Sequence, residues 1–581
     1  MAAERGSYLK KWTGQLPVAL VYPNSYAVGM SSLGFQLVYG LLGRMDGLVC
    51  ERFFLDDPSQ PLRSLESGHL LSDFPLIFCS ISFEHDYLNL VRLLRLGGIQ
   101  PLAEDRDEQV RAGQPLVICG GVVTFMNPEP LAPFVDLFLV GEAEPVLDDF
   151  MNCLLEGFPG TGREELLAQL AREVRGCYAP RFYKPQYGAG ETGAFQGFNV
   201  TREGLPKRIA VNRVSECQTA AHSQVLTPEA EFSDLYLTEL GRGCSRGCRF
   251  CAAGFIYRPP RLWDAQAVRA GVEQRFTGVN RVGLLGMEMA PQENLAELAD
   301  YLRADGCSLS FSSLRADRIS GPLLELLAAS DIKSVAIAPD GASERLRRVI
   351  NKGLDRDDLL DAAERLVGAG LNRLKLYVMI GLPTETEDDL AEFVELIRAI
   401  KKRILPLGRS RGHLTEINLS LNSFVPKPWT PFQFHAFGVS EQLAPGEIRP
   451  MKQALGLLKG RIKWLQKELR HEANVRMNHD KPEQVLFQAV LSRADRRMGP
   501  VLLDMADSGR PWKQAMKRQG LTPEQFAVCG HGREAVFPWS LVGQEIEQDY
   551  LWHEYMKGLA EKTTVPCDTA LCKRCGVCNA E

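Results

Sequence analysis

Three cysteines near the middle of the chain have the spacing of a metal site. Within LTELGRGCSRGCRFCAAGFIYRP (237–259), Cys244, Cys248 and Cys251 are separated by three and by two residues. Iron–sulfur clusters and structural zinc are both bound by cysteine thiolates, and a closed site uses four protein ligands. Three thiolates leave one corner of a four-iron cluster open, as catalytic zinc keeps one position free. The motif therefore predicts a catalytic cluster, with a structural zinc that takes a remote fourth ligand as the alternative.

The residues between these cysteines fit a bound cluster. Gly243 and Gly247 allow the backbone to turn tightly around a bulky group. Arg242, Arg246 and Arg249 bring positive charge, which we expect to lower the pKa of the thiols and to favour the thiolate ligands.

The elements that position this motif belong to an alternating series of strands and helices over residues 231–440. The motif follows the first strand, which places it on the loop face where barrel enzymes carry their chemistry. Six strand–helix units predict a partial (β/α)6 barrel with an open side for a large substrate. The expected strands are LYLTEL, RVGLLGME, SLSFSSLRA, SVAIAPD, RLKLYVMIGLP and EINLSLNSFVP.

A second alternating series fills residues 1–155, where apolar strands such as PVALVYP and QPLVICGG are separated by helical patterns. It predicts an α/β, Rossmann-like doubly wound domain with a parallel sheet. Ligands of such sheets bind at the carboxyl ends of the strands. Plain turns are the alternative role for the glycines found there. The candidate cofactor-binding residues are Asn24, Gly29, Gly120, Gly121, Gly141 and Glu142.

The remaining regions are a connector over 156–230, which is expected to contain a hairpin, and a helical extension over 441–560. Between Lys452 and Arg518 the extension has 15 Lys and Arg against 7 Asp and Glu. This excess predicts a phosphate-binding face, with an ordinary solvated helix surface as the alternative.

The last region, 561–581, is rich in cysteine and reads CDTALCKRCGVCNAE from its first cysteine. Four thiols within twelve residues predict a second, knot-like metal site, for which zinc and an auxiliary [4Fe–4S] cluster are equal alternatives, and cysteines that bind no metal are a third. Its cysteines are Cys567, Cys572, Cys575 and Cys578.

With an aromatic residue before its third cysteine, the central motif resembles the signature of the radical S-adenosylmethionine (SAM) superfamily. The resemblance implies a [4Fe–4S] cluster whose open iron binds SAM, and one-electron cleavage of SAM to a 5′-deoxyadenosyl radical. It also implies an electron donor such as flavodoxin or ferredoxin. An ordinary strand-end turn is the alternative for each of the outer positions. The matching cofactor-binding residues are Phe250, Gly286, Glu288, Ser313, Arg315 and Asp340.

Four further segments make the resemblance more specific. YPNSYAVGMSSLG, NPEPLAPFVDLFLVGEAE, APDGASERLRRVINKG and NSFVPKPWTPFQF resemble radical SAM proteins with an N-terminal cobalamin (B12)-binding-type domain, a largely uncharacterised branch. The wider group uses cobalamin as a methyl carrier. The Asp-x-His-x-x-Gly loop that supplies a cobalt ligand in many B12 folds is absent, and His85 lacks its spacing. Either cobalamin binds without a protein histidine or the domain no longer binds it.

Composition bounds the compartment and the function. A chain of 581 residues with 45% hydrophobic and 24% charged residues is expected to form several globular domains. No apolar run spans a bilayer and no secretory signal opens the chain, so we expect a cytoplasmic protein that binds no membrane. Because thiols stay reduced in the cytoplasm, we do not expect the fifteen cysteines to form a framework of disulfides.

The sequence thus predicts a radical SAM enzyme that functionalises a substrate C–H bond. The specific hypotheses are cobalamin-dependent methylation and a substrate that is RNA or a ribonucleoprotein component, with a small metabolite or a peptide as the alternative substrates. The alternative function is a non-catalytic iron–sulfur or zinc protein that binds RNA or senses redox state.

Overall fold

The first sheet is built by apolar strands that are buried on both faces, as parallel strands covered by helices require. In the computed structural model, which describes residues 4–57, 60–188, 193–286, 292–311, 314–330 and 332–579, its strand order is β2-β1-β3-β4-β5-β6. All neighbours are parallel except β5 and β6. The strands are β1 (Leu16–Tyr22), β2 (Leu48–Phe54), β3 (Leu76–Ser80), β4 (Leu116–Gly120), β5 (Leu137–Leu139) and β6 (Cys177–Tyr178).

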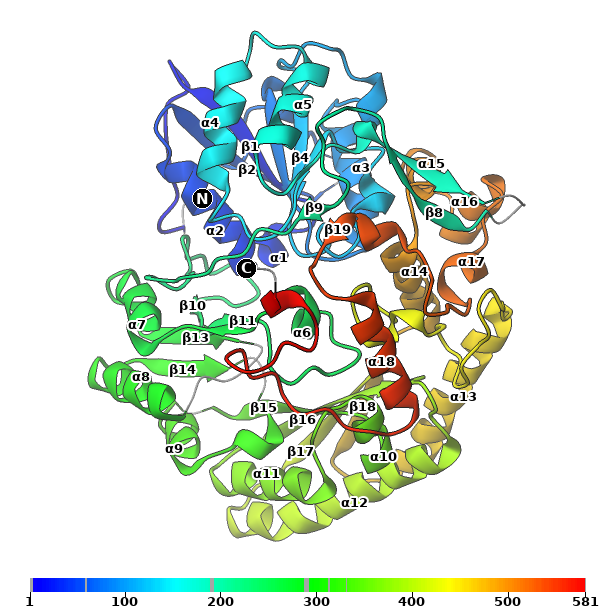
Figure 1. Cartoon of the computed structure of the whole chain (residues 1–581). Coiled ribbons are helices and arrows are strands. Elements are labelled where there is room, and N and C mark those ends of the chain that lie inside the picture. Colours follow the sequence, from blue (N-terminus) through cyan, green and yellow to red (C-terminus); the bar gives the residue numbers. More distant parts are fainter. Residues whose placement is uncertain are drawn as a thin grey trace.

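This strand order reverses between β1 and β3, which is the switch point where doubly wound sheets bind ligands. The sheet extends beyond residue 155, because β6 adds an antiparallel edge strand. The expected hairpin of the connector is formed by β7 (Tyr183–Tyr187) and β8 (Phe195–Val200). Figure 1 shows the sheet with its helices at the top of the molecule. These helices are α2 (Leu33–Arg44), α3 (Asp86–Leu96), α4 (Leu147–Gly157) and α5 (Arg163–Glu173).

The central region contains all six expected strands, each paired in parallel with its neighbour. One sheet has the order β10-β13-β14 and the other β15-β16-β17-β18, and a parallel bridge from Leu314 to Ile337 joins the two. The strand β18 (Val475–His479) was not expected, because its sequence VRMNH is polar and largely exposed. The expected strands are β10 (Tyr236–Glu239), β13 (Arg281–Leu285), β14 (Ser308–Phe311), β15 (Ser334–Asp340), β16 (Arg373–Ile380) and β17 (Glu416–Ser423).

Amphipathic helices cover these strands and are fixed by side-chain caps. Ser343 caps α10, and Asp355 forms a capping box at the start of α11. Together with the first region they establish the predicted mixed α/β fold. The helices are α7 (Ala265–Glu273), α8 (Gln292–Ala304), α9 (Gly321–Ala329), α10 (Glu344–Val349), α11 (Arg356–Gly368) and α12 (Glu387–Ser410).

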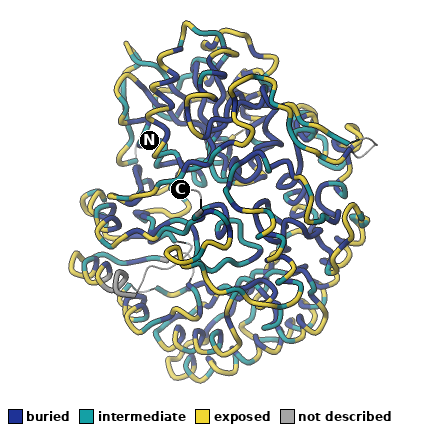
Figure 2. Tube along the Cα trace, in the orientation of Figure 1, coloured by how far each residue is buried: buried dark blue, intermediate teal, exposed yellow. Residues whose placement is uncertain are grey.

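The C-terminal helices connect the two sheets. Asn127, after β4, donates to the carbonyls of Ser492 and Ala494, and Arg496 forms an ion pair with Glu129 at 2.8 Å. Figure 2 shows that buried segments continue from the upper sheet into the lower one. In the described parts of the chain, no helix is both long and apolar enough to cross a membrane. The helices are α13 (Met451–Leu469), α14 (Pro482–Arg493), α15 (Met498–Ser508), α16 (Trp512–Arg518), α17 (Pro523–Ala527) and α18 (Gln548–Leu559).

Candidate active site

The three-cysteine loop lies at the carboxyl end of β10, as its position in the sequence predicts. It runs from β11 (Gly241–Arg242) to α6 (Ala253–Ile256), and its three thiols are near enough to interact electrostatically. Gly243 has a φ of +85°, and a Cβ there would lie 2.8 Å from the carbonyl oxygen of Tyr257. Only glycine fits this turn without strain, so the tight turn predicted at Gly243 is present.

Backbone contacts hold this loop from two sides. The Asn351 side chain donates to the carbonyls of Arg246 (3.2 Å) and Gly247 (3.4 Å). The amide of Cys567 donates to the carbonyl of Ser245 at 2.7 Å, so the cysteine-rich tail packs directly on the loop. Figure 1 shows this red C-terminal segment beside α6. The loop is therefore fixed before any metal binds.

The arginines of the motif do not act as predicted. Arg249 is fully buried and turns to α18, where it pairs with Glu554 at 3.1 Å. Arg242 pairs with Glu144 at 2.5 Å and with Glu239 at 3.0 Å. Arg246 lies 3.5 Å from Asp317, so all three guanidinium groups are paired with carboxylates. The expectation that these arginines lower the pKa of the thiols is wrong for this loop.

Burial dominates the thiols instead. It raises the pKa of Cys248 to about 12 and also raises the pKa of Cys251, and the cation that opposes both shifts is Lys352. As free thiols, Cys248 and Cys251 are therefore protonated at neutral pH, and a metal must displace these protons when it binds. Lys352 lies after α10, more than a hundred residues from the motif. Its place in APDGASERLRRVINKG gave no sign of this contact.

Two predicted SAM contacts lie beside this lysine. Asp340, at the end of β15, is 2.5 Å from the Lys352 ammonium group. Arg315 donates from Nη2 to the carbonyls of Lys352 (2.7 Å) and Gly353 (2.9 Å), and its Nε is 2.7 Å from Asp317. The structure thus brings Arg315, Asp340 and the cysteine loop together, with Lys352 between them. Phe250 is half-buried in the loop, whereas Glu288 and Ser313 lie outside the described residues.

A cavity of about 480 Å³ separates the two sheets at their carboxyl ends. Its walls are mostly apolar, with Phe78, Ile118 and Leu139 on one side and Tyr257 and Leu285 on the other. None of the described residues that line it is a histidine. Five predicted residues line it from both sheets, namely Gly120, Gly121, Gly141, Glu142 and Gly286.

Two other predicted N-terminal residues do not reach this cavity. Asn24 donates to Asp86 at 3.0 Å. Gly29 is buried in α1 (Tyr26–Met30), where a Cβ would lie 2.5 Å from the ring of Phe54. Both residues contribute to the packing after β1, and their assignment to a ligand site stays a prediction.

The glycines that do line the cavity also have a backbone role. Gly121 and Gly141 have φ values of +102° and +108°, and a Cβ at Gly141 would lie 2.3 Å from the carbonyl oxygen of Asn212. Turn geometry requires glycine at these two positions, and their role toward a ligand stays a prediction.

Glu142 joins the first sheet to the cysteine loop. Its carboxylate is 2.7 Å from Arg261 and 3.1 Å from Arg242, and it accepts from the amide of Val214 at 2.6 Å. Burial alone would raise the pKa of Glu142, but Arg261 and Arg242 outweigh it and hold the pKa below its usual value. The ionised Glu142 carboxylate therefore links the first sheet to the arginines beside the cysteine loop. We call this set of ion pairs the Glu142 clasp.

The four tail cysteines also form one group. Cys567 interacts electrostatically with the other three, and Cys575 is buried. Arg258, which follows α6 at the end of the cysteine loop, reaches toward the tail. Its guanidinium lies over the ring of Tyr550 in α18 and interacts with Cys575. Among the described residues, no three Cys, His, Asp or Glu side chains are arranged to hold a single metal ion. Thiols are nevertheless the donors that clusters use, and a cluster spreads its thiolates over several irons.

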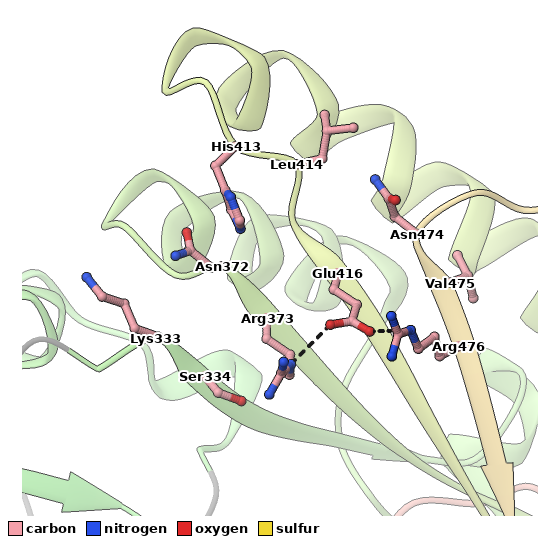
Figure 3. A pocket seen from close by; sticks show the side chains of 10 residues that line it. All are labelled: Lys333, Ser334, Asn372, Arg373, His413, Leu414, Glu416, Asn474, Val475 and Arg476. Carbon is pink, nitrogen blue, oxygen red and sulfur yellow. Dashed lines mark hydrogen bonds and ion pairs between the residues drawn. The ribbon is translucent and has the colours of Figure 1, made fainter.

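A larger cavity of about 630 Å³ lies at the opposite, amino end of β15, β16 and β17 (Figure 3). Arg373 and Arg476 both pair with Glu416 there. Barrel chemistry occurs at the carboxyl ends of the strands, whereas this cavity lies at their amino ends. We therefore do not assign this cavity to the active site.

Many charges of the predicted phosphate-binding region are also paired. Arg493 is buried, and at least seven of the 15 basic side chains form ion pairs, some with acidic residues of other regions. This pairing reduces the positive charge available to a nucleic acid. The paired residues are Lys459, Arg461, Arg476, Arg496, Arg497, Arg510 and Arg518.

Comparison with known families agrees with this arrangement. Residues 34–180 match the family of N-terminal regions of radical SAM proteins, and residues 238–397 match the radical SAM superfamily. The second range contains the cysteine loop, Arg315 and Asp340. The chain therefore belongs to the radical SAM superfamily, and the predicted family and its [4Fe–4S] and SAM cofactors are confirmed.

Individual relatives extend the comparison. The uncharacterized protein MJ0966 of Methanocaldococcus jannaschii is 26% identical over 491 residues, which cover 84% of this chain and 90% of that protein. Mycofactocin maturase MftC of Mycolicibacterium smegmatis is 28% identical over 27% of this chain and 40% of its own length. The radical SAM methyltransferase TsrM of Kitasatospora setae, solved with cobalamin and a [4Fe–4S] cluster, is similar in structure, with a TM-score of 0.51 and 15% identity. That likeness covers 87% of this chain and 98% of TsrM, and it shows a shared fold.

Proposed function

We propose that this radical SAM protein is a cobalamin-dependent enzyme that methylates a substrate carbon. The observation that carries the proposal is the cavity between the two carboxyl edges, which is bordered on one side by Gly120, Gly121 and Gly141 and on the other by the entry to the cysteine loop. Such a position allows a cofactor held by the first sheet to face a substrate activated at the second. TsrM, a methyltransferase that binds cobalamin, shares this fold.

Cys244, Cys248 and Cys251 would hold the cluster, since no fourth thiol belongs to the loop. When bound, a cluster of this kind supplies the electron that cleaves SAM into methionine and a 5′-deoxyadenosyl radical. The protein's own part is to hold the ligands, to orient SAM and to exclude water. We assign the orientation to Arg315 and Asp340, with Lys352 between Asp340 and Cys248. Glu288, Ser313, Phe250 and Gly286 stay predictions for the same role.

Cobalamin would occupy the central cavity without a histidine ligand from its walls. The apolar lining and the glycines at the strand ends let the backbone approach a bulky ring closely. A water-poor cavity also protects a reactive carbon radical from side reactions.

The test is anaerobic reconstitution with iron, sulfide and hydroxocobalamin, followed by dithionite and SAM. We expect 5′-deoxyadenosine and a cobalamin absorption band that elutes with the protein. A chain that binds metal and leaves SAM intact would instead support the redox-sensing or RNA-binding alternative. Cleavage of SAM without bound cobalamin would keep the radical chemistry and overturn the methyl transfer.

The tail cysteines are proposed as a second metal site, with zinc and [4Fe–4S] distinguished by metal analysis of the same preparation. RNA or a ribonucleoprotein as substrate, and flavodoxin or ferredoxin as electron donor, stay predictions. Comparing RNA and protein masses between a wild-type and a deletion strain tests the substrate. A loss of 14 Da on RNA is the expected sign of one missing methyl group, about one CH₂ in mass.

A further inference from the structure

A third cavity, of about 560 Å³, is lined by residues of α17, by the last residue of α14 and by the segment after α17, and by none of the cysteines of the two groups. Figure 1 shows α14 and α17 at the right of the molecule. Three aromatic side chains form much of its wall, and the segment after α17 closes one side. The ring of Phe537 stacks on Trp539 with a centroid distance of 4.5 Å, and Phe526 is also buried. The cavity is thus preformed by rigid aromatic residues.

A buried cation faces this cavity without a carboxylate partner. Arg493, at the end of α14, is 3% exposed, and among the described residues it forms no ion pair. Its Nε donates to the carbonyl of Phe526 (2.9 Å) and its Nη1 to that of Gln433 (2.8 Å). The remaining nitrogen, Nη2, is buried without a hydrogen-bond acceptor at good geometry. The thiol of Cys529, a weak acceptor, interacts with this guanidinium, and the imidazoles of His531 and His435 also lie within reach of its charge. A guanidinium stays charged, so leaving it uncompensated in a protein interior is costly.

A second unpaired donor lines the same cavity. The backbone amide of Thr522 donates to Oε1 of Gln525 at 3.2 Å, which fixes the orientation of this side-chain amide. Its Nε2 is therefore the donor end, and it is buried without a partner. Two separate side chains thus present unsatisfied N–H groups in one cavity, and the ligand they call for is an acceptor with negative charge.

The other ionisable groups of the cavity supply no such acceptor. Asp495 is held by Arg497 at 2.7 Å, and the Glu534 side chain is 94% exposed. Arg533 pairs with Asp549 outside the cavity. Burial, and then the charge of Arg493, lower the pKa of His531 to about 3, so this imidazole is neutral at pH 7 and adds no charge.

We propose that this cavity binds a small organic monocarboxylate, with its carboxylate on Arg493 and Gln525 and its apolar body against Phe526, Phe537 and Trp539. One guanidinium with a neighbouring amide matches the two oxygens and the single charge of a carboxylate. A phosphate dianion fits less well, because the cavity offers one unpaired cation. The proposal is independent of the radical SAM chemistry, since none of these residues belongs to the cysteine loop or the central cavity.

The test measures binding to the full chain under anaerobic conditions by calorimetry and by the fluorescence of the cavity tryptophan. The probes are phenylacetate, benzoate and hexanoate, with phenylacetamide as the uncharged analogue and inorganic phosphate as the other anion. We expect at least one carboxylate to bind at least about tenfold more tightly than phenylacetamide and phosphate, the factor expected for one charge-assisted hydrogen bond. Failure of all three carboxylates to bind overturns the proposal, and preferential binding of phosphate overturns the choice of carboxylate.

Variants locate the site. Arg493→Met and Gln525→Leu should each weaken carboxylate binding, the first by at least about tenfold. Arg533→Met is the matched control, because this arginine lines the same cavity but is paired at the surface, and it should bind normally. Cys248→Ser should also bind normally, which separates this site from the SAM site. If Arg493→Met does not fold, Gln525→Leu alone decides, and unchanged binding by Gln525→Leu contradicts the proposal.

Discussion

The two cysteine groups of this chain lie side by side but are supported in opposite ways. The loop that contains Cys248 is anchored by Asn351 and by a fully buried arginine, and burial raises the pKa of the Cys248 and Cys251 thiols. The tail group is a terminal segment whose Cys572 accepts from Arg574 at 3.1 Å; burial would raise the pKa of Cys572, but Arg574 holds it below the usual value. The fold thus holds the three-thiol loop through buried contacts, whereas in the four-thiol segment, for which a metal is proposed, Cys572 contacts an exposed arginine. This difference matches an open catalytic cluster beside a closed, fully ligated metal site.

The strongest way to break this comparison is to remove one loop thiol. Cys248→Ser should lose about four irons per chain and lower 5′-deoxyadenosine formation by more than about a hundredfold, because only three protein ligands hold that cluster. Iron analysis and chromatography of the nucleoside products measure both effects. Cys307→Ser, outside both groups, is the control. Normal SAM cleavage by Cys248→Ser would refute the assignment of the loop.

The anchoring of the loop can be tested through the partner of its buried arginine. Glu554→Ala leaves Arg249 buried without a carboxylate, which should destabilise the chain by about 3–5 kcal/mol. Urea unfolding of the metal-free protein gives the free energy. Glu561→Ala removes a surface partner of Arg345 and Arg348 and should cost less than about 1 kcal/mol. Equal effects of the two substitutions would mean that the buried pair does not anchor the loop.

Removing one tail thiol tests whether the two cysteine groups bind their metals independently. Cys575→Ser should remove the tail metal while the loop keeps its cluster, so SAM cleavage should stay within about tenfold of the wild type, as expected when the open iron is untouched. Metal analysis and the cleavage assay are made on the same sample. Loss of all iron from Cys575→Ser would show instead that the two groups share one cluster.

The smallest effect concerns the clasp between the regions. Glu142→Gln should lower stability by about 1–3 kcal/mol at neutral pH, since a charged hydrogen-bond partner is lost. The pKa of Glu142 is depressed in the folded chain, so its contribution is present above the unfolded value of about 4.3 and is lost as pH falls through the folded pKa. Unfolding of wild type and variant between pH 3 and 6 should converge at the acid end. A difference that does not depend on pH would contradict the ionised clasp.

Much of the fold was predictable, because long apolar runs such as those of β1, β4 and β16 have one compatible structure each. The cysteine motif was predictable from spacing alone. Its supports were not, since Asn351, Lys352 and Glu554 come from segments about 100 to 300 residues away and carry no local pattern. The residue type predicted a positive charge at Arg249. It could not predict that this side chain points away from the thiols toward α18, because the packing of α18 determines that orientation. The short polar strand β18 was missed because neither periodicity nor β-propensity marks it.

The central claim is that the loop's cluster has one iron without a protein ligand, to which SAM binds. Electron–nuclear double resonance of the dithionite-reduced, reconstituted chain tests it directly, with SAM labelled by ¹⁵N in its amino group or ¹⁷O in its carboxylate. The account predicts hyperfine coupling of both labels to the cluster in the wild type and in Cys575→Ser. A reduced cluster that shows neither coupling at saturating SAM would contradict it.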